Sequence, residues 1–198
     1  MNQPFRLGLT GSIGMGKSTT AEMFGAEGVP VWDADAAVHR LYDKDGAGVA
    51  AVQALCPACV PDGAVDRTRL KAWIAEDQSH LPRLEAAIHP LVAEDRAAFL
   101  ETAKADIVLL DIPLLYETGG AADMDAVVVV SVSATIQKAR VMSRDGMTEA
   151  HFAQILARQM PDAEKRARAN FVITTKSLEA AKAQVHDVLK QVRSRIDA

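Results

Sequence analysis

The chain has 198 residues, of which 49% are hydrophobic and 24% charged, and this length suits one globular domain with insertions. The net charge of −4 argues against nucleic acid or an anionic membrane as a general partner of the surface. The first residues lack the apolar stretch of a signal peptide, and the longest strongly apolar run, 126–132, is far too short to cross a bilayer. We therefore expect a cytoplasmic protein.

Five short apolar segments are the predicted strands of the fold. They cover residues 5–10, 29–32, 107–110, 126–132 and 171–174. Continuous apolar runs such as those at 107–110 and 126–132 are typical of strands that are buried on both faces, as in parallel sheets. Because helical segments alternate with these strands, we predict an α/β fold in which helices cover a five-stranded parallel sheet.

Helices are predicted between and after these strands. One begins near Lys17, and another carries Val38, Leu41 and Tyr42 at helical spacing. The last helix is expected to start after Ser177, whose side chain suits a helix N-cap. Its apolar residues lie three and four positions apart and so form one face of a helix: Leu178, Ala181, Val185, Val188, Leu189, Val192 and Ile196.

Two connections are longer than simple crossovers. About 70 residues separate the second and third predicted strands, where a crossover needs only about a dozen. Helical runs at 69–75 and 91–103 indicate that 44–104 is an inserted, substrate-binding helical module. The second connection, 138–168, has a net charge of +3 on a negative chain, which favours an anionic ligand there. The alternative is a solvated helical face with ordinary ion pairs four residues apart.

The chain has two cysteines, in the segment Cys56-Pro57-Ala58-Cys59. A C-x-x-C pair can indicate zinc or redox chemistry. Zinc sites need about four ligands, and the sequence has no second Cys/His pair at metal-site spacing. No clear strand precedes Cys56, as a redox motif would require. We therefore expect two reduced thiols in a loop or at a helix end.

A phosphate-binding motif follows the first predicted strand. Residues 11–18, Gly-Ser-Ile-Gly-Met-Gly-Lys-Ser, match G-x-x-x-x-G-K-[ST], whose glycines let backbone N–H groups turn inward around phosphate oxygens. Because the motif also opens a predicted helix, we prefer this interpretation to an incidental glycine-rich turn. It predicts a small ATP-dependent kinase with a fold of the P-loop NTPase type. The residues expected to bind the nucleotide are Gly11, Gly14, Met15, Gly16, Lys17, Ser18 and Thr19.

Carboxylates follow the second and third predicted strands. Asp33 and Asp35 come after the second strand, where a carboxylate can orient and deprotonate an attacking hydroxyl. The alternative is local, because Asp33 can cap the next helix and Asp35 can lie in its first turn. Asp111 ends the third strand, as does the Asp of a Walker B strand that holds Mg²⁺.

Two arginines of the basic connection, Arg140 and Arg144, lie four residues apart on a predicted helix. Both can therefore face one site and neutralise charge on a transferring phosphoryl group. His89, which precedes a proline, is expected to be a packed or substrate-contacting side chain rather than a general base.

The chain resembles the dephospho-CoA kinase family over nearly its full length. The segments that carry the resemblance are, in chain order, residues 9–19, Asp33-Ala34-Asp35, Asp66-Arg67 with Leu70, Ile88-His89-Pro90-Leu91, Pro113-Leu114-Leu115-Tyr116-Glu117, and Arg140, Arg144 and Gln159. Only the phosphate loop is specific by itself, and the ordered combination indicates the family. The chain departs from the family pattern at Ala169-Asn170, where Ala-Asp is frequent, and at Thr174-Thr175, where the family usually has an Asn near the adenine. Residues 54–64 also match poorly.

The resemblance implies a reaction and a division of the chain. ATP would give its γ-phosphoryl group to the ribose 3′-hydroxyl of dephospho-CoA, yielding coenzyme A and ADP. Residues 1–43, 105–137 and 169–198 would form the nucleotide-binding core, 44–104 the helical module for the CoA precursor, and 138–168 a helical lid.

The resemblance also implies roles for individual residues. Asp35 would accept the proton of the attacking hydroxyl. Lys17, Arg140 and Arg144 would stabilise the charge of the transferring phosphoryl group. The residues implied to bind the acceptor are Asp33, Arg67, His89, Pro113, Leu114 and Glu117.

The implied cofactor beside ATP is Mg²⁺, bound partly through water by Ser18 together with Asp33 or Asp111. The expected partners are the two small-molecule substrates, with no nucleic acid and no membrane. We expect a monomer or a weak homo-oligomer.

Two other functions are weighed against this one. Another small-molecule P-loop kinase, such as a nucleoside-monophosphate or shikimate-type enzyme, would share the phosphate loop, but the long insertion argues against a small acceptor. A nucleotide-switched GTPase-like module would need N-K-x-D after a strand. The nearest segment offers only Thr174-Thr175-Lys176-Ser177.

Overall fold

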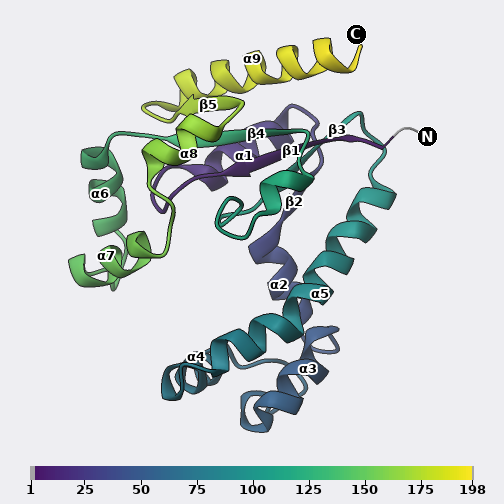
Figure 1. Cartoon of the computed structure of the whole chain (residues 1–198), viewed down its shortest axis with the longest axis vertical. Helices are drawn as coiled ribbons and strands as arrows, with labels where there is room; N and C mark the ends of the chain where they lie inside the picture. The colour runs from purple at the N-terminus through teal and green to yellow at the C-terminus, as the bar shows by residue number, and fades with distance from the viewer. Residues whose placement is uncertain (1–2, 198) are drawn as a thin grey trace. The chain divides into compact units, whose positions relative to one another are not determined.

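The structure is a computed structural model that describes residues 3–197 and divides into two compact units. We call residues 32–102 the helical unit and the described residues on either side of it, 3–31 and 103–197, the sheet unit. Figure 1 shows the elements of both units. Within residues 3–197, no helix has the length and apolar character that crossing a membrane requires.

A five-stranded sheet has the order β2-β3-β1-β4-β5. The strands are β1 (Phe5–Thr10), β2 (Val31–Asp33), β3 (Ile107–Asp111), β4 (Ala126–Ser131) and β5 (Phe171–Thr174). β1 pairs in parallel with β3 and β4, and β4 pairs in parallel with β5. The predicted parallel α/β fold is therefore confirmed.

The second strand begins later than the sequence predicted. Val29 still belongs to the turn after the first helix, because its N–H donates to the carbonyl of Phe24 at 3.2 Å. Pro30 has no N–H to donate to a strand ladder, although its carbonyl accepts from the amide of Leu109 at 2.9 Å. The strand therefore starts at Val31 rather than at residue 29.

The helices of the sheet unit connect these strands and follow the last one. They are α1 (Lys17–Ala26), the short 3₁₀ helix η2 (Gly120–Asp123), α6 (Ala134–Met142), α7 (Glu149–Ala157), α8 (Asp162–Arg168) and α9 (Leu178–Ile196). The predicted cap of α9 is confirmed, since the Ser177 hydroxyl accepts from the amide of Ala180. Figure 1 shows α9 running along β5, with which it is in contact.

Both faces of the sheet are buried, because alternate strand residues point to opposite sides. Leu7 and Leu9 of β1 belong to the core that α1 and α9 complete, whereas Val127 and Val129 of β4 pack with Leu115 on the other face. Each buried side chain of this size contributes about 1.5–3 kcal/mol to folding. The buried face of α9 consists of Ala181, Val185, Val188, Leu189 and Val192.

The predicted apolar face of α9 is too long at both ends. Leu178 is 67% exposed and Ile196 is 41% exposed. They are the first and last residues of the helix, and the residues buried against the sheet unit's core are confined to 181–192. Leu178 instead lines a cavity that is described below.

The helical unit has a hydrophobic core of its own. Its elements are α2 (Ala34–Tyr42), α3 (Gly48–Leu55), the 3₁₀ helix η1 (Pro57–Cys59), α4 (Arg67–Glu76) and α5 (His80–Thr102). The predicted helical runs at 69–75 and 91–103 fall in α4 and α5, respectively. α5 begins well before its predicted run and contains Pro90.

The helical unit also includes α2, which the sequence assigned to the nucleotide-binding core. Asp95 of α5 holds α2 and the residues before it. Its carboxylate accepts from the guanidinium of Arg40, on α2, at 2.5 Å, and from the indole N–H of Trp32, which precedes α2, at 2.7 Å. The hydrogen bond from Arg40, with that from Trp32, holds the pKa of Asp95 below its usual value despite partial burial. The functional roles of the two units stay predictions.

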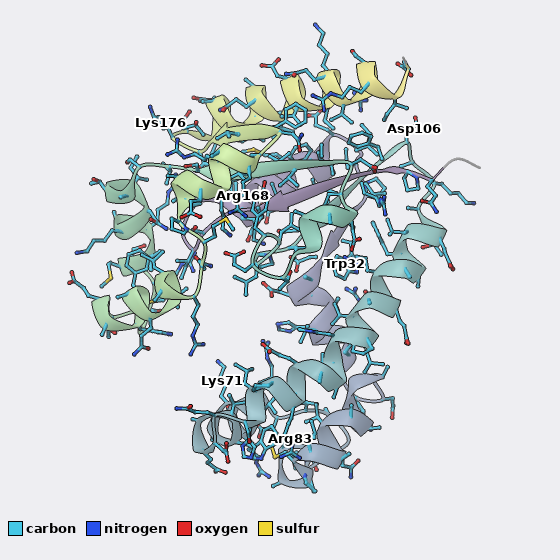
Figure 2. All side chains as sticks on the ribbon, in the orientation of Figure 1. Trp32, Lys71, Arg83, Asp106, Arg168 and Lys176 are labelled. Atoms are coloured by element: carbon cyan, nitrogen blue, oxygen red, sulfur yellow. A yellow bond between two sulfur atoms is a disulfide. The ribbon has the colours of Figure 1, made fainter. Side chains whose placement is uncertain are left out.

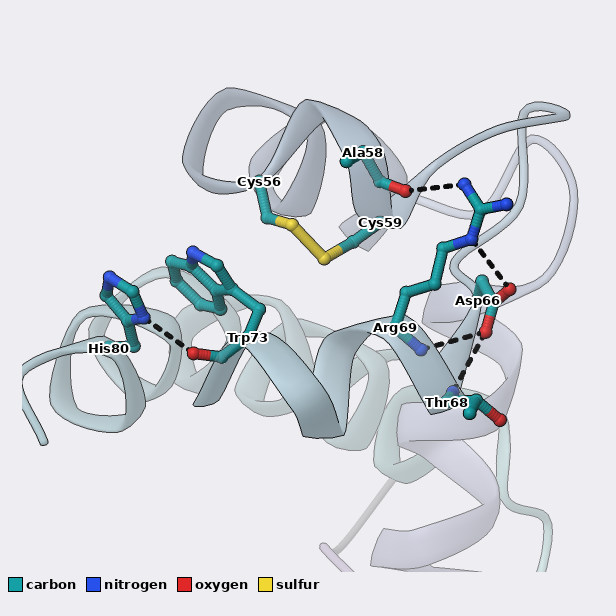
Figure 3. The surroundings of a disulfide bond; sticks show 8 residues. All are labelled: Cys56, Ala58, Cys59, Asp66, Thr68, Arg69, Trp73 and His80. Atoms are coloured by element: carbon teal, nitrogen blue, oxygen red, sulfur yellow. Dashed lines mark hydrogen bonds and ion pairs between the residues drawn. A yellow bond between two sulfur atoms is a disulfide. The ribbon is translucent and has the colours of Figure 1, made fainter. Parts of the chain in front are cut away.

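The expectation of two reduced thiols is wrong, because Cys56 and Cys59 form a disulfide (Figure 3). Their position at a helix end is as expected: α3 ends at Leu55, and η1 turns the chain back so that the Cys59 amide donates to the Cys56 carbonyl at 2.9 Å. This turn brings the two Cα atoms within 5.3 Å of each other. Both cysteines are buried in the core of the helical unit.

We expect the disulfide to stabilise the protein even though it closes a short loop. For a loop of four residues, the restriction of the unfolded chain is worth about 2 kcal/mol. The double variant Cys56→Ala/Cys59→Ala should therefore melt roughly 4–8 °C below the oxidised wild type. Thermal unfolding followed by circular dichroism measures this, and wild type in dithiothreitol provides the control. Identical melting of the oxidised and reduced wild type would contradict a stabilising role.

Candidate nucleotide-binding site

The phosphate loop, residues 11–18, joins β1 to α1, and the local structure requires glycine at each of its three glycine positions. Gly14 and Gly16 have φ angles of 76° and 89°, in the left-handed region that glycine adopts readily. Gly11 has an ordinary φ, but a Cβ there would lie 2.4 Å from a methyl group of Val130. The loop is therefore a glycine-dependent turn that ends at the N-terminus of α1, where backbone N–H groups favour anions.

Side chains from α6 and from the segment between α7 and α8 hold this loop. The amide of Gln137 donates to the carbonyl of Ile13 at 2.8 Å, and the Ile13 N–H donates to Gln159 Oε1 at 3.1 Å. Gln137 was not among the site residues predicted from the sequence. The signal available for it was position: Gln137 lies four residues before the buried Val141, on the same face of α6.

Lys17 and Asp111, both predicted site residues, lie in contact. The Lys17 ammonium donates to Asp111 Oδ1 at 2.5 Å, and the Asp111 side chain is almost completely buried. Asp111 ends β3 directly opposite Leu9 of β1, so the strand register brings it to the phosphate loop. Together with the exposed Ser18 on the first turn of α1, Asp111 offers oxygen ligands of the kind that Mg²⁺ prefers. The residues of the sheet unit therefore fit the expected magnesium site.

A cavity of about 400 Å³ lies beside the loop. Its walls include Gly14 and Gly16, residues of α1, Arg140 of α6, Arg144 and the turn between β5 and α9. The predicted helix carries only Arg140, because α6 ends at Met142 and Arg144 lies in the turn that follows. The structure thus brings Arg140 and Arg144 to one cavity. Lys176, labelled in Figure 2, adds a third cation from the turn after β5, and Leu178 adds an exposed apolar surface. Cations beside an apolar wall suit a ligand with both phosphate and a heterocyclic base.

The segment after β3 is attached to α8 by a buried ion pair. Glu117 Oε1 accepts from the Lys165 ammonium at 2.9 Å and from the Met160 amide at 2.7 Å. Lys165 is 0% exposed. Burial opposes ionisation of the Glu117 carboxyl, but the hydrogen bonds from Lys165 and Met160 outweigh it and hold the pKa of Glu117 below its usual value of 4.5. Glu117, which was predicted to bind the acceptor, therefore uses Oε1 to connect the segment after β3 to α8 and to the residues before it.

The residues just after β3 are also held in place by a hydrogen bond. The hydroxyl of Thr10 donates to the carbonyl of Pro113 at 2.9 Å, which fixes the chain just beyond the end of β3. Leu114, the next residue, is exposed. Both residues were predicted to contact the acceptor, and the structure leaves the Leu114 side chain accessible for that role.

The other predicted acceptor residues belong to the helical unit. Asp33 caps α2, since its Oδ1 accepts from the Ala36 amide at 2.9 Å, so the capping alternative is observed for this residue. Asp35 lies in the first turn of α2 and is exposed. The exposed Arg67 begins α4 and its guanidinium contacts the imidazole of His39.

His89 is exposed on α5. It therefore is not the packed side chain that the sequence left open as one alternative. A contact of His89 with substrate stays a prediction.

Comparison with known proteins gives the family. The sequence profile of the family described as dephospho-CoA kinase matches residues 5–180. The dephospho-CoA kinase of Cereibacter sphaeroides is 63% identical over 196 residues, which cover 99% of this chain and 100% of that protein. The chain belongs to the dephospho-CoA kinase family. The dephospho-CoA kinase of Ruegeria pomeroyi is 62% identical over 96% of both chains. The resemblance in the sequence motifs is thus confirmed, and the chain is an ATP-dependent kinase of this family.

Solved structures agree with this assignment. A Thermus thermophilus protein is 31% identical and superposes with a TM-score of 0.84 over 98% of both chains. The dephospho-CoA kinase of Campylobacter jejuni has a TM-score of 0.67 at 20% identity, over 94% of this chain and 96% of that chain. The shikimate kinase of Acinetobacter baumannii has a TM-score of 0.55 at 16% identity, over 97% and 94% of the two chains. The last two share the fold alone, and they confirm the P-loop kinase fold.

We expect the Glu117–Lys165 pair to make stability depend on pH. In Glu117→Gln the ammonium of Lys165 stays buried without its counter-charge, and such a loss typically costs about 3–5 kcal/mol. Because the pKa of Glu117 is lowered by folding, its contribution is present above its usual value of 4.5 and is lost as the pH falls through the lowered pKa. The deficit of the variant should therefore be large at neutral pH and shrink in acid.

Urea unfolding at neutral pH and at about pH 3 or 4 measures both parts of this expectation. Glu164→Gln is the matched control, because Glu164 lies 3.9 Å from Arg168 in an exposed ion pair. Exposed pairs of this kind contribute about 0–1 kcal/mol. Equal deficits in the two variants, or a Glu117→Gln deficit that does not change with pH, would show that the buried pair has no special weight.

Proposed function

We propose that the chain transfers the γ-phosphoryl group of ATP to the ribose 3′-hydroxyl of dephospho-CoA, producing coenzyme A and ADP. The observation that carries the proposal is the Lys17–Asp111 pair at a glycine-dependent phosphate loop, in a chain that is 63% identical over its length to a dephospho-CoA kinase. The loop supports the binding of the ATP phosphates, and membership of the family supports dephospho-CoA as the acceptor.

In the proposed complex, the β- and γ-phosphates lie in the phosphate loop. The Lys17 ammonium has three N–H donors, so it can keep its hydrogen bond to Asp111 and donate to phosphate oxygens as well. Ser18 with Asp111 or Asp33 would hold Mg²⁺, which when bound neutralises charge on the β- and γ-phosphates. The adenosine part would occupy the 400 Å³ cavity, which both Arg140 and Arg144 line. Lys17 and Arg144 keep the predicted role of stabilising the transferring phosphoryl group, whereas Arg140, which is hydrogen-bonded to Thr175, is proposed to act mainly in nucleotide binding.

The acceptor is proposed to be bound in large part by the helical unit. Asp35 is exposed on the first turn of α2 and is the proposed base that takes the proton of the 3′-hydroxyl. Arg67 carries a charge that suits the diphosphate of dephospho-CoA, and His89 presents an exposed imidazole. Asp33, Pro113, Leu114 and Glu117 complete the proposed acceptor set.

The proposed setting follows from the proposed reaction. ATP and dephospho-CoA are the partners, and Mg²⁺ is the metal. We also propose a cytoplasmic location and a monomer or weak homo-oligomer, in line with the chain's ordinary composition and its net charge of −4.

The decisive experiment is a coupled assay of ADP release by the purified full chain. We expect release from ATP to depend on dephospho-CoA, with much lower rates for shikimate as acceptor or GTP as donor. Lys17→Ala should lose most turnover and keep its circular dichroism spectrum, although loss of the ammonium beside the buried Asp111 carboxylate should lower its melting temperature. Lys182→Ala, which removes an exposed lysine of α9, is the control. Acceptor-independent ADP release, or near-normal turnover of Lys17→Ala, would overturn the proposal.

A second experiment separates the two possible roles of Asp35. If Asp35 is the base, Asp35→Asn should lower turnover by a factor on the order of 10² to 10⁴ and change ATP affinity little. If Asp35 only supports the N-terminus of α2, the variant should lose about 0.3–1 kcal/mol of stability and little turnover. Asp33→Asn is the comparison, because asparagine caps helices as well as aspartate does. Full turnover with a lowered melting temperature in Asp35→Asn would leave only the structural role.

A further inference from the structure

Thr175 follows β5 and is a polar residue that is only 7% exposed. Its backbone position is fixed, because its N–H donates to the carbonyl of Ser131 at 3.0 Å and so extends the pairing of β4 with β5 by one residue. Its side chain packs on the phosphate loop: a Cβ built on Gly16 would lie 3.1–3.2 Å from three Thr175 atoms. The chain departs from the family pattern here, where an Asn is usual, and the sequence predicted no role for the threonine.

The Thr175 hydroxyl makes two hydrogen bonds whose directions are determined. A carbonyl oxygen can only accept, so the hydroxyl donates its single proton to the carbonyl of Met15, at 2.7 Å. A guanidinium can only donate, so the same hydroxyl accepts from Arg140 Nη1, at 3.0 Å. The second guanidinium nitrogen, Nη2, donates to the Thr175 carbonyl at 2.6 Å. One threonine therefore binds both the arginine and the loop.

The position of this arrangement indicates which ligand it serves. Arg140 and Thr175 line the cavity of about 400 Å³, together with Thr19 and Met23 of α1, which lie further along the helix than Lys17. The held guanidinium thus faces the cavity proposed for the adenosine part of the nucleotide. Contacts made there exist in the bound ground state as well as in the transition state, so they change the binding of the nucleotide more than its rate of reaction.

We propose that Thr175 is a positioning residue for the nucleotide: its hydroxyl holds Arg140 in the cavity and ties it to the phosphate loop at Met15. An arginine side chain has many rotamers, and ordering it when the ligand arrives would weaken binding. The hydrogen bonds to the hydroxyl and the carbonyl of Thr175 order the Arg140 side chain before the ligand binds. The inference rests on the proposed function only in taking ATP as the phosphoryl donor.

The test removes the hydroxyl and then restores it. Thr175→Val keeps the shape of the side chain, and Thr175→Ser keeps the hydroxyl. We expect Thr175→Val to raise both the KM for ATP and the Kd for a non-hydrolysable ATP analogue about tenfold, with kcat changed less than about threefold. Thr175→Ser should stay close to wild type. A purely structural role would instead follow the loss of the methyl group, so Thr175→Ser would be impaired and Thr175→Val would stay close to wild type.

Two further variants complete the test. Thr174→Val is the control, because Thr174 is the adjacent residue and its backbone groups are bonded to Gln184 of α9. Its KM should be unchanged. Arg140→Lys keeps the positive charge but loses the paired guanidinium donors, so it should raise the KM by a similar factor even if Thr175→Val fails to fold. In the Arg140→Lys background, Thr175→Val should add little.

The outcomes are distinct from those of the acceptor assay. The analogue titration by calorimetry needs no dephospho-CoA, so a tenfold weaker Kd would support the inference even if another acceptor were used. An unchanged Kd in Thr175→Val, or a Ser variant as weak as Val, would overturn it. A raised KM in Thr174→Val as large as that in Thr175→Val would overturn it as well.

Discussion

The nucleotide site depends on the parallel register between β1 and its two neighbours. Leu9 of β1 lies opposite Asp111 of β3, and Thr10 lies opposite Val129 of β4. These three strands therefore end at one edge of the sheet, and the chain that follows each of them starts there. The phosphate loop follows β1, the segment that anchors α8 follows β3, and α6 with Gln137 and Arg140 follows β4. A slip in the pairing of β1 with β3 would separate Lys17 from Asp111.

The phosphate loop keeps its shape through contacts with the surrounding elements, in addition to the burial of Met15 in the core of the sheet unit. Its glycines face contacts from three different elements, because added Cβ atoms would meet Val130 of β4, Val141 of α6 and Thr175 after β5. Its peptide groups at Ile13 are held by two glutamine side chains. The glycine motif thus satisfies two requirements at once: inward-facing N–H groups for phosphate, and close approach of the neighbouring elements. The second requirement explains why residues outside the motif, Thr175 among them, can influence nucleotide binding.

Local patterns in the sequence were enough to predict the five strands, the phosphate loop, and Lys17 and Asp111 as separate site residues, but not the contact between these two side chains. Each of these depends on residues that are close in sequence or on the common edge of a parallel sheet. Gln137 and Thr175 were missed because their roles depend on partners that only the fold brings near; Thr175 lies 160 positions from Met15. The disulfide was missed for a different reason. C-x-x-C spacing permits thiols or a disulfide, and the turn after α3 decides between them.

The two buried ion pairs of the sheet unit have different consequences, although each joins a lysine to a carboxylate. Desolvation offsets most of the attraction in such pairs, so neither is a strong source of stability, yet removing one partner is costly. Lys165 is fully buried, and its partner Glu117 also accepts from a backbone amide, so this ammonium is closed to ligands and the pair fixes α8. The Lys17 side chain is 15% exposed and its pair lies at the phosphate loop. A phosphate can therefore reach an ammonium that the buried carboxylate of Asp111 has already oriented. The exposure of the ammonium, rather than the type of pair, therefore decides whether a ligand can reach it.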